Sequence, residues 1–342
     1  MAPHAPRKWI APLLGLALAA PGQAWGQQID VVIDPDLARQ AGVDPEQVRA
    51  EIRNATDGAL KMDAPEAFLR QMATANAFAT KGMGADYASN PQRFFAGAAL
   101  GTAVNGAGFT FVRGSDTMPT AGFAFQAAAN AGLNLGFLAD DESVLRRVVI
   151  SANGMYAKGA AGLFDAELSN VGAHVQIKLI RPEHEGLVEW GGLDVTGGYE
   201  VSTYRLSLAQ ALPVETDGLR WDAQGTFDIA AASHTIPIEV STNLRVFVVS
   251  VYAGGALDIR REANARGEAS LGGPLTASSQ GREMQIGTVS ATLASSGDAE
   301  SLYTPRVFAG AQINVLWVKV YGHLNVGFDD TYAGHLGLRV AL

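Results

Sequence analysis

The feature that most constrains this chain is a strict two-residue alternation at residues 123–137. The other parity of this stretch holds Gln126, Asn130 and Asn134 among glycine and alanine. Successive side chains on a strand point to opposite faces, so this segment predicts a strand with one apolar and one polar or small face. The apolar parity consists of Phe123, Phe125, Ala127, Ala129, Ala131, Leu133, Leu135 and Phe137.

The same pattern recurs along the chain, and its segments run for roughly 10 to 15 residues. Strands of soluble β-sandwiches average about 5–6 residues, whereas a tilted strand needs about 9–11 residues to cross a bilayer. The pattern therefore predicts an all-β fold, an antiparallel transmembrane β-barrel over residues 92–342. Further segments with one apolar parity are 171–179, 193–201, 221–231, 307–315, 318–328 and 332–342.

The strand number follows less directly from the sequence. Clear segments and the even number usual for bacterial barrels give about 12 strands, with 10 as the alternative. The apolar parity changes between Ile286 and Val289, which indicates either a bulge or a misread strand. Residues 232–245 are hard to divide because Pro237 should not lie inside a fully paired strand. Polar residues 260–283 are interpreted as a long connection.

The C-terminal residues resemble the terminal strand of bacterial outer-membrane β-barrels. Leu336, Leu338, Val340 and Leu342 share one parity, and the sequence ends inside this strand. The resemblance covers residues 92–342 and implies an outer-membrane location, contact with outer-membrane lipid, and recognition by the barrel-assembly machinery. Leu342 departs from the commonest pattern, which ends in Phe or Trp. Residues 252–258 also look like strands of porin-like and surface-protein barrels.

Residues 1–26 have the three parts of a secretory signal peptide. Arg7 and Lys8 form the positive end, residues 9–20 are apolar, and Ala24 and Gly26 are the small residues before a cut at Gln27. The apolar run is shorter than the ~20 residues of a membrane-spanning helix. The sequence therefore predicts an exported chain with a cleaved leader.

Residues 27–91 predict a short helical segment. Asp44, Pro45 and Gln47 have the layout of a capping box, and Asp63, Pro65 and Glu66 repeat it. The first helix is expected to run to about residue 59 and the second to Gly82. The sequence leaves open whether these helices form a periplasmic domain or a plug inside the barrel.

Composition excludes several function classes. The chain has no cysteine, so it has neither disulfides nor thiolate metal ligands. Its net charge of −9 argues against nucleic-acid binding, which needs a basic face to replace phosphate counterions. The mature histidines are scattered, and His184 has no second histidine at metal-ligand spacing. We therefore expect no enzyme activity, no catalytic residues, no metal and no cofactor.

The polar parity of the strands supplies candidate pore-lining residues. Two interpretations stay open: an aqueous path whose charges set ion preference, or internal salt bridges that close a small barrel. The sequence favours a porin-like channel for small solutes. The alternatives are a structural or adhesive surface protein acting through residues 260–283, and a component of an envelope machine held through the 28–91 helices to a periplasmic or extracellular partner. The candidates are His174, Lys178, Glu200, Arg220, Asp222, Asp228, Lys319 and His323.

Overall fold

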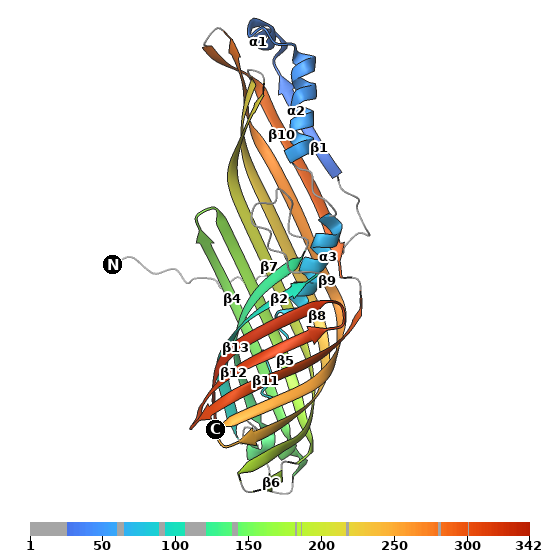
Figure 1. The fold of residues 1–342 in the computed structure, drawn as a ribbon, viewed down its shortest axis with the longest axis vertical. Coiled ribbons are helices and arrows are strands. Elements are labelled where there is room, and N and C mark those ends of the chain that lie inside the picture. The colour runs from blue at the N-terminus through green and yellow to red at the C-terminus, as the bar shows by residue number, and fades with distance from the viewer. Residues whose placement is uncertain are drawn as a thin grey trace, which may run out of the picture.

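The computed structural model describes residues 26–59, 65–88, 93–106, 121–138, 143–181, 183–185, 187–216, 219–279, 282–299 and 301–342. Of the predicted leader only Gly26 lies within these residues. The described chain forms one antiparallel sheet that curls into a barrel and continues beyond one end of it (Figure 1). Helices and one further strand precede the barrel in the sequence.

Among the described residues, ten strands close the ring of the barrel. β13 pairs with β2 on one side and β12 on the other, so the last strand joins the first. This confirms the antiparallel barrel, with the smaller of the two strand numbers that the sequence allowed. In order around the ring, the strands are β2 (Phe94–Asn105), β3 (Gly122–Asn134), β4 (Val148–Ala161), β5 (Phe164–Ile180), β7 (Val188–Thr216), β8 (Leu219–Val246), β9 (Val249–Ser279), β11 (Tyr303–Val315), β12 (Val318–Gly327) and β13 (Thr331–Ala341).

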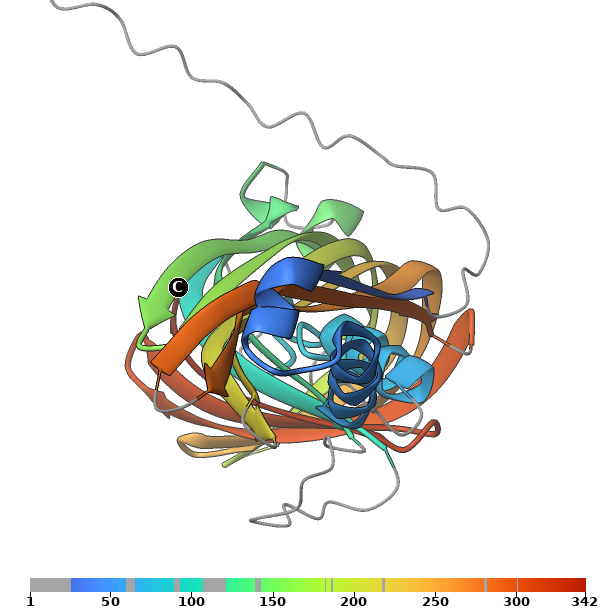
Figure 2. The same cartoon turned by 90° about the horizontal axis from the view of Figure 1, so that it is seen from above.

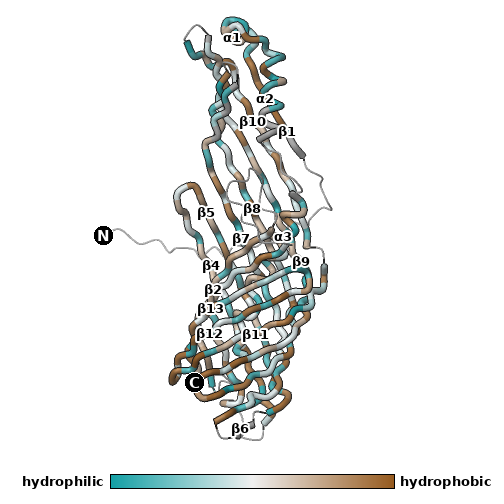
Figure 3. Tube along the Cα trace, viewed as in Figure 1, coloured by the Kyte–Doolittle hydropathy of each residue, from teal (hydrophilic) through white to brown (hydrophobic). Residues whose placement is uncertain are grey.

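The outer face of the barrel is an apolar belt, and the face toward the lumen is polar. β12 is apolar or glycine on its outer face from the turn before it to the turn after it, and its 10 residues match the length of a tilted membrane strand. Figure 3 shows hydrophobic segments on the barrel strands around β11, β12 and β13. Exposed residues of the belt include Val171, Val175, Ile238, Val240, Val251, Leu257, Val307, Ile313, Val320, Leu324, Leu336 and Leu338.

Three ring strands are much longer than a membrane crossing requires. β7, β8 and β9 have 29, 28 and 31 residues, and they continue past the belt. Beyond it they join β10 (Arg282–Asp298) and β1 (Gly26–Ile33) in the order β7–β8–β9–β10–β1. We call this part of the sheet the extension. We call the opposite end of the barrel, where the C-terminus lies, the turn end (Figure 1).

The inner face of β8 changes from polar to apolar where the extension begins. Odd-numbered residues face inward along the strand; in the barrel they include the polar Glu239 and Ser241, and in the extension Trp221, Ala223 and Ile229. In the barrel the strand has lipid outside, whereas in the extension it has helices inside. In each part of the strand, the apolar side chains therefore lie on the face that is shielded from water: toward lipid in the barrel and toward the helices in the extension. This change marks the border between the belt and the extension on β8.

β9 makes the same change through a β-bulge. Its partners on β8 shift between His234 and Thr235, which leaves Arg261 as an extra residue. One extra residue reverses which parity faces inward. Odd residues such as Leu257 therefore face lipid before the bulge, whereas Leu271 and Leu275 face the inside of the extension after it.

The N-terminal helices cover the inner face of the extension. α1 (Pro35–Gln40) and α2 (Pro45–Ala59) follow β1, and α3 (Pro65–Phe78) continues toward the barrel. Val48 and Ile52 of α2 pack against Trp221 and Leu275 in one buried cluster. The two helices predicted from their caps are confirmed, although α3 ends before Gly82. β1 and α1 were not predicted.

Two other details differ from the sequence interpretation or explain it. Residues 260–283 are not a connection, because β9 runs to Ser279 and its polar residues alternate outward. Pro237 lies inside β8, where its partner on β9 is Asp258 and the ladder to β7 skips this position. A proline without N–H is therefore accommodated. Of the two alternatives for the parity change, the bulge is confirmed, between Gln285 and Gly287.

Trp221→Ala should detach α1 and α2 from the extension, because Trp221 is fully buried against them. Loss of such a side chain costs about 3–5 kcal/mol. We expect faster proteolysis within residues 34–59 while the barrel keeps its heat-dependent gel migration. The control is Arg220→Ala, on the exposed face of the same strand. Equal protease resistance of the two variants would contradict the packing described.

Candidate functional site: the plug in the lumen

Residues 65–88, which we call the plug, occupy the interior of the barrel. α3 enters from the extension, and residues 79–88 continue without regular secondary structure toward the turn end. Residues 72–88 are all buried. Seen from above, α3 lies inside the ring of strands (Figure 2). Phe68 and Leu69 pack against the wall, so the helix is part of the barrel core.

The irregular part of the plug keeps its backbone hydrogen-bonded through side chains of the wall. Irregular backbone at membrane depth is tolerated only where protein satisfies its polar groups. The wall supplies a donor to the carbonyls of residues 79, 81, 83, 85 and 86. The donors are His335 Nε2 at 2.8 Å, Asn325 Nδ2 at 3.0 Å, Asn130 Nδ2 at 2.8 Å, a terminal nitrogen of Arg339 at 2.9 Å and Gln176 Nε2 at 3.3 Å, respectively.

A buried ion pair joins the plug to β7. Lys81 Nζ lies 2.5 Å from Glu200 Oε2, and both side chains are at most 5% exposed. Thr80 Oγ1 donates to the same carboxylate at 3.2 Å, and His174 Nε2 lies 3.6 Å from its other oxygen. Because a buried charge without a partner is strongly unfavourable, this pair ties the plug to one position in the lumen.

A second ion pair has the opposite polarity. Asp86 of the plug lies 2.8 Å from Arg339 of β13, and both side chains are almost fully buried. Tyr87 donates from its hydroxyl to Glu239 of β8 at 2.7 Å. The plug therefore presents one cation and one anion to complementary charges on different sides of the ring.

Arg306 of β11 connects the walls beside the plug. Its guanidinium pairs with Glu239 and lies 2.9 Å from Asp258 and 2.6 Å from the side-chain oxygen of Asn325. A planar guanidinium with several donors suits such a junction. Tyr87 packs against Phe308 next to it, with ring centroids 4.9 Å apart. These contacts fill the middle of the lumen with paired polar groups and aromatic rings.

Gly84 lets the plug pass close to the wall. A Cβ at this position would lie 2.3 Å from His174 Nε2 and 2.5 Å from Asn153 Oδ1, both from buried side chains. Gly82 has a φ of 90°, which favours glycine, and a Cβ there would meet His323. The two glycines are therefore required by the fit between plug and wall.

Five of the predicted pore-lining residues lie on the inner face of the barrel. Glu200 and His174 contact the plug or lie beside it, and His323 stacks with Tyr87 at a centroid distance of 5.5 Å. Lys178 pairs with Asp194 at 3.0 Å and Lys319 donates to the carbonyl of Leu316, both nearer the turn end. None of these five side chains is fully exposed.

Arg220, Asp222 and Asp228 are not in the lumen, contrary to the sequence prediction. They lie on the outer face of β8 in the extension, where Arg220 and Asp222 pair at 2.8 Å and Asp228 accepts a hydrogen bond from Ser207. The hydrogen bond to Asp222 raises the pKa of Arg220. The physical reason is that helices cover the inside of the extension, so the apolar parity of β8 faces inward there.

Sequence reasoning missed the charged residues that join the plug and the walls of the lumen. Lys81 lies at the end of the second predicted helix and Asp86 beyond it, and no pattern distinguishes either residue from a surface charge. Arg306, Glu239, Asp258 and Arg339 lie on the polar parity of apolar strands, and this signal could have identified them. Within the described ranges, no helix is long and apolar enough to cross a membrane. In the same ranges, no three His, Cys, Asp or Glu residues are grouped as metal ligands.

Glu200→Gln should leave Lys81 buried without its charge partner. Removal of one member of a buried pair costs about 3–5 kcal/mol, measured as the free energy of unfolding in urea from lipid vesicles. The double variant with Lys81→Met should recover most of this loss. Glu167→Gln removes the half-buried partner of the exposed Arg205, at 3.7 Å, and should cost less than about 1 kcal/mol. Equal effects of the two single variants would refute the tie between plug and wall.

Comparison with solved structures finds outer-membrane barrels of low similarity. The translocator domain of the autotransporter NalP from Neisseria meningitidis is 9% identical, with a TM-score of 0.31, and the match covers 74% of this chain and 90% of that one. The toluene transporter TbuX from Ralstonia pickettii is 9% identical, with a TM-score of 0.26 and coverage of 80% and 93%. The outer membrane protein Omp33 from Acinetobacter baumannii is 9% identical, with a TM-score of 0.26 and coverage of 74% and 100%.

Residues 43–342 match the family described as Lsa36-like. No curated protein sequence matches the chain. The closed antiparallel ring and its apolar belt are the properties of a transmembrane β-barrel, which in bacteria lies in the outer membrane. The chain is thus an outer-membrane β-barrel protein, and the predicted location is confirmed.

Proposed function

We propose that this chain, a member of the Lsa36-like family, is a surface-display protein: a sealed outer-membrane barrel that holds its extension outside the cell. The observation that carries the proposal is the plug, whose buried backbone and two ion pairs occupy the lumen. A sealed barrel serves as an anchor, and function then falls to the extension. Its exposed outer face and helices would contact a partner outside the cell.

The direction of the barrel supports this assignment. Bacterial barrels have short periplasmic turns and longer extracellular parts. At the turn end β8 joins β9 through Phe247 and Val248, and β11 joins β12 through Leu316 and Trp317, while the β3–β4 and β5–β7 connections there are longer. The extension, with α1 and α2, lies at the opposite end (Figure 1). It therefore belongs on the outer side of the membrane.

The porin-like channel favoured by the sequence stays a prediction. A channel needs a continuous water path, whereas residues 72–88 are buried in the lumen. The envelope-machine alternative requires the helices of residues 28–91 on the periplasmic side, and the proposed direction places α1 and α2 on the other side. We also propose that the chain has no enzyme activity and that β13 is the strand recognised by the barrel-assembly machinery.

The direction can be tested by labelling single cysteines on intact cells, since the chain has none of its own. Asp30→Cys lies on the exposed side of β1, and Arg93→Cys is exposed at the turn end. An impermeant maleimide should label the first on intact cells and the second only after the outer membrane is opened. The reverse order would overturn the proposed display.

The sealed lumen can be tested by conductance in planar bilayers. The native chain should show no steady current, because the plug fills the lumen. Gly84→Trp should displace the plug, because even a Cβ there would meet His174, and conductance should then rise. Gly159→Trp, where a Cβ meets nothing within 4 Å, is the matched control and should stay silent. Steady current from the native chain would restore the channel function.

A further inference from the structure

The two tight hairpins at the turn end carry large apolar residues at their tips. Phe247 and Val248 form one turn, and Leu316 and Trp317 form the other; we call these four residues the turn collar. Leu316 is 81% exposed, Phe247 64% and Trp317 61%. Two-residue hairpin turns are usually made of Asn, Asp and Gly. An aqueous environment does not explain this composition.

The backbone of the collar opposes the residues that it carries. Phe247 has a φ of 53° and Leu316 a φ of 54°. These left-handed conformations favour glycine and are unfavourable for bulky side chains. Both turns therefore keep a large apolar side chain where the local backbone disfavours it. A favourable contact outside the chain would account for this choice.

All four carbonyl groups of the collar are hydrogen-bonded from within the protein. A turn in water leaves such groups to solvent, whereas hydrocarbon requires that the protein satisfy them. The collar has the arrangement expected in hydrocarbon: its carbonyl groups are satisfied by the protein, and its outward surface is apolar. The donors are Arg245 Nε to Phe247 at 3.0 Å, the amide of Asn314 to Val248 at 2.6 Å, Lys319 Nζ to Leu316 at 3.2 Å, and the amide of Ala341 to Trp317 at 2.9 Å.

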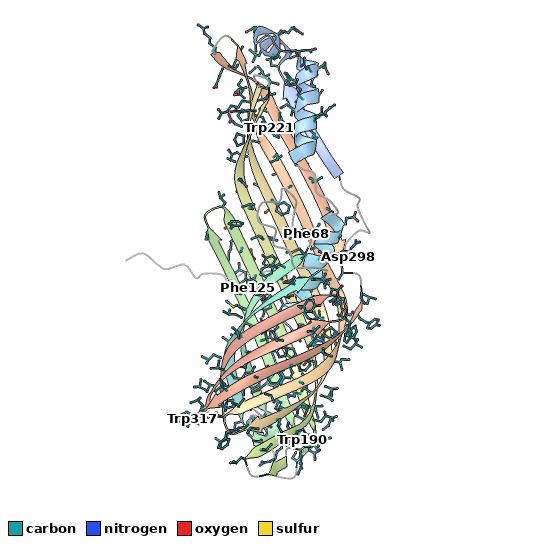
Figure 4. The ribbon with its side chains drawn as sticks, in the orientation of Figure 1. Phe68, Phe125, Trp190, Trp221, Asp298 and Trp317 are labelled. Carbon is teal, nitrogen blue, oxygen red and sulfur yellow. The ribbon has the colours of Figure 1, made fainter. Side chains whose placement is uncertain are left out.

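The height of the belt places the collar at the edge of the hydrocarbon. β12 crosses the barrel in 10 residues between Trp317 and Phe328, and a tilted strand needs about 9–11 residues for the hydrocarbon layer. No part of β12 is left to carry the turn beyond the bilayer. Figure 4 shows Trp317 and Trp190 near the turn end and Trp221 far away in the extension.

We propose that the turn collar is inserted into the boundary between headgroups and acyl chains of the adjacent leaflet. Its partner is thus the phospholipid surface rather than a second protein. Exposed arginines at the same end, Arg93, Arg146 and Arg181, suit phosphate groups at that level. The barrel is thereby fixed at a defined depth by its turns. The inference is independent of which side of the membrane the extension occupies.

Tryptophan fluorescence in vesicles tests the depth of the collar. In the mature chain, Trp190→Phe with Trp221→Phe leaves Trp317 as the reporter. Phosphatidylcholine brominated near the headgroup end of its acyl chains should quench the fluorescence of Trp317 at least about threefold more than aqueous acrylamide does, as for an interfacial aromatic residue. The matched control keeps only Trp221, which is fully buried in the extension and should not respond to brominated lipid.

A substitution at the strained turn gives a result of opposite sign for the two environments. Asn adopts positive φ more readily than Leu, so Leu316→Asn should raise stability if the turn faces water. In the lipid boundary it loses its apolar contact, and the folding equilibrium in vesicles should fall by about tenfold. Asp330→Asn is the control, because Asp330 has a φ of 56° in the polar turn at the other end of β12. It should leave stability unchanged.

Three outcomes would overturn the proposal. The first is quenching of Trp317 by acrylamide but not by brominated lipid, which places the collar in water. The second is a stability gain from Leu316→Asn. The third is efficient photo-crosslinking of position 317 to another protein in cells without lipid quenching, which makes the collar a protein-docking surface.

Discussion

Hydrocarbon offers no hydrogen-bond partner, and this constraint determines most of the structure. The ring satisfies it in part by pairing β13 with β2, which joins the last strand to the first. The plug satisfies it differently, because its irregular backbone has no strand partner and depends on donors such as Asn130 and His335. The wall of the lumen is therefore polar because its side chains supply hydrogen bonds to the plug. Charges that resemble a pore lining, such as Glu200, instead pair with the plug.

The exchange of faces along β8 and β9 shows how one sheet serves two environments. In the barrel the outer face of the sheet is shielded from water, whereas in the extension the inner face is shielded. β8 accomplishes this by changing which parity is apolar, and β9 by keeping its parity and inserting Arg261. Both solutions place the boundary beside Arg260, which pairs with Asp329 of the neighbouring turn at 3.1 Å. Ion pairs and the bulge thus coincide at the border between the belt and the extension.

Alternation in the sequence predicted the class of fold well, because period-2 patterning is a local property of a strand. It could not predict which face points inward, since that depends on what covers the sheet. Arg220 and Asp222 were misplaced for this reason, and Pro237 made residues 232–245 hard to divide. No pattern distinguishes the plug residues Lys81 and Asp86 from surface charges, and only the fold brings them to Glu200 and Arg339.

The length of the shared strands has a mechanical consequence. β9 passes from the membrane to the distal tip as 31 continuous residues, a contour of about 100 Å at the usual rise per residue. A force applied at α2 would travel along hydrogen-bonded ladders loaded parallel to the strands and would meet no flexible linker on that path. The extension should thus be rigid, with its tip held at a constant height above the bilayer and with little freedom to reorient.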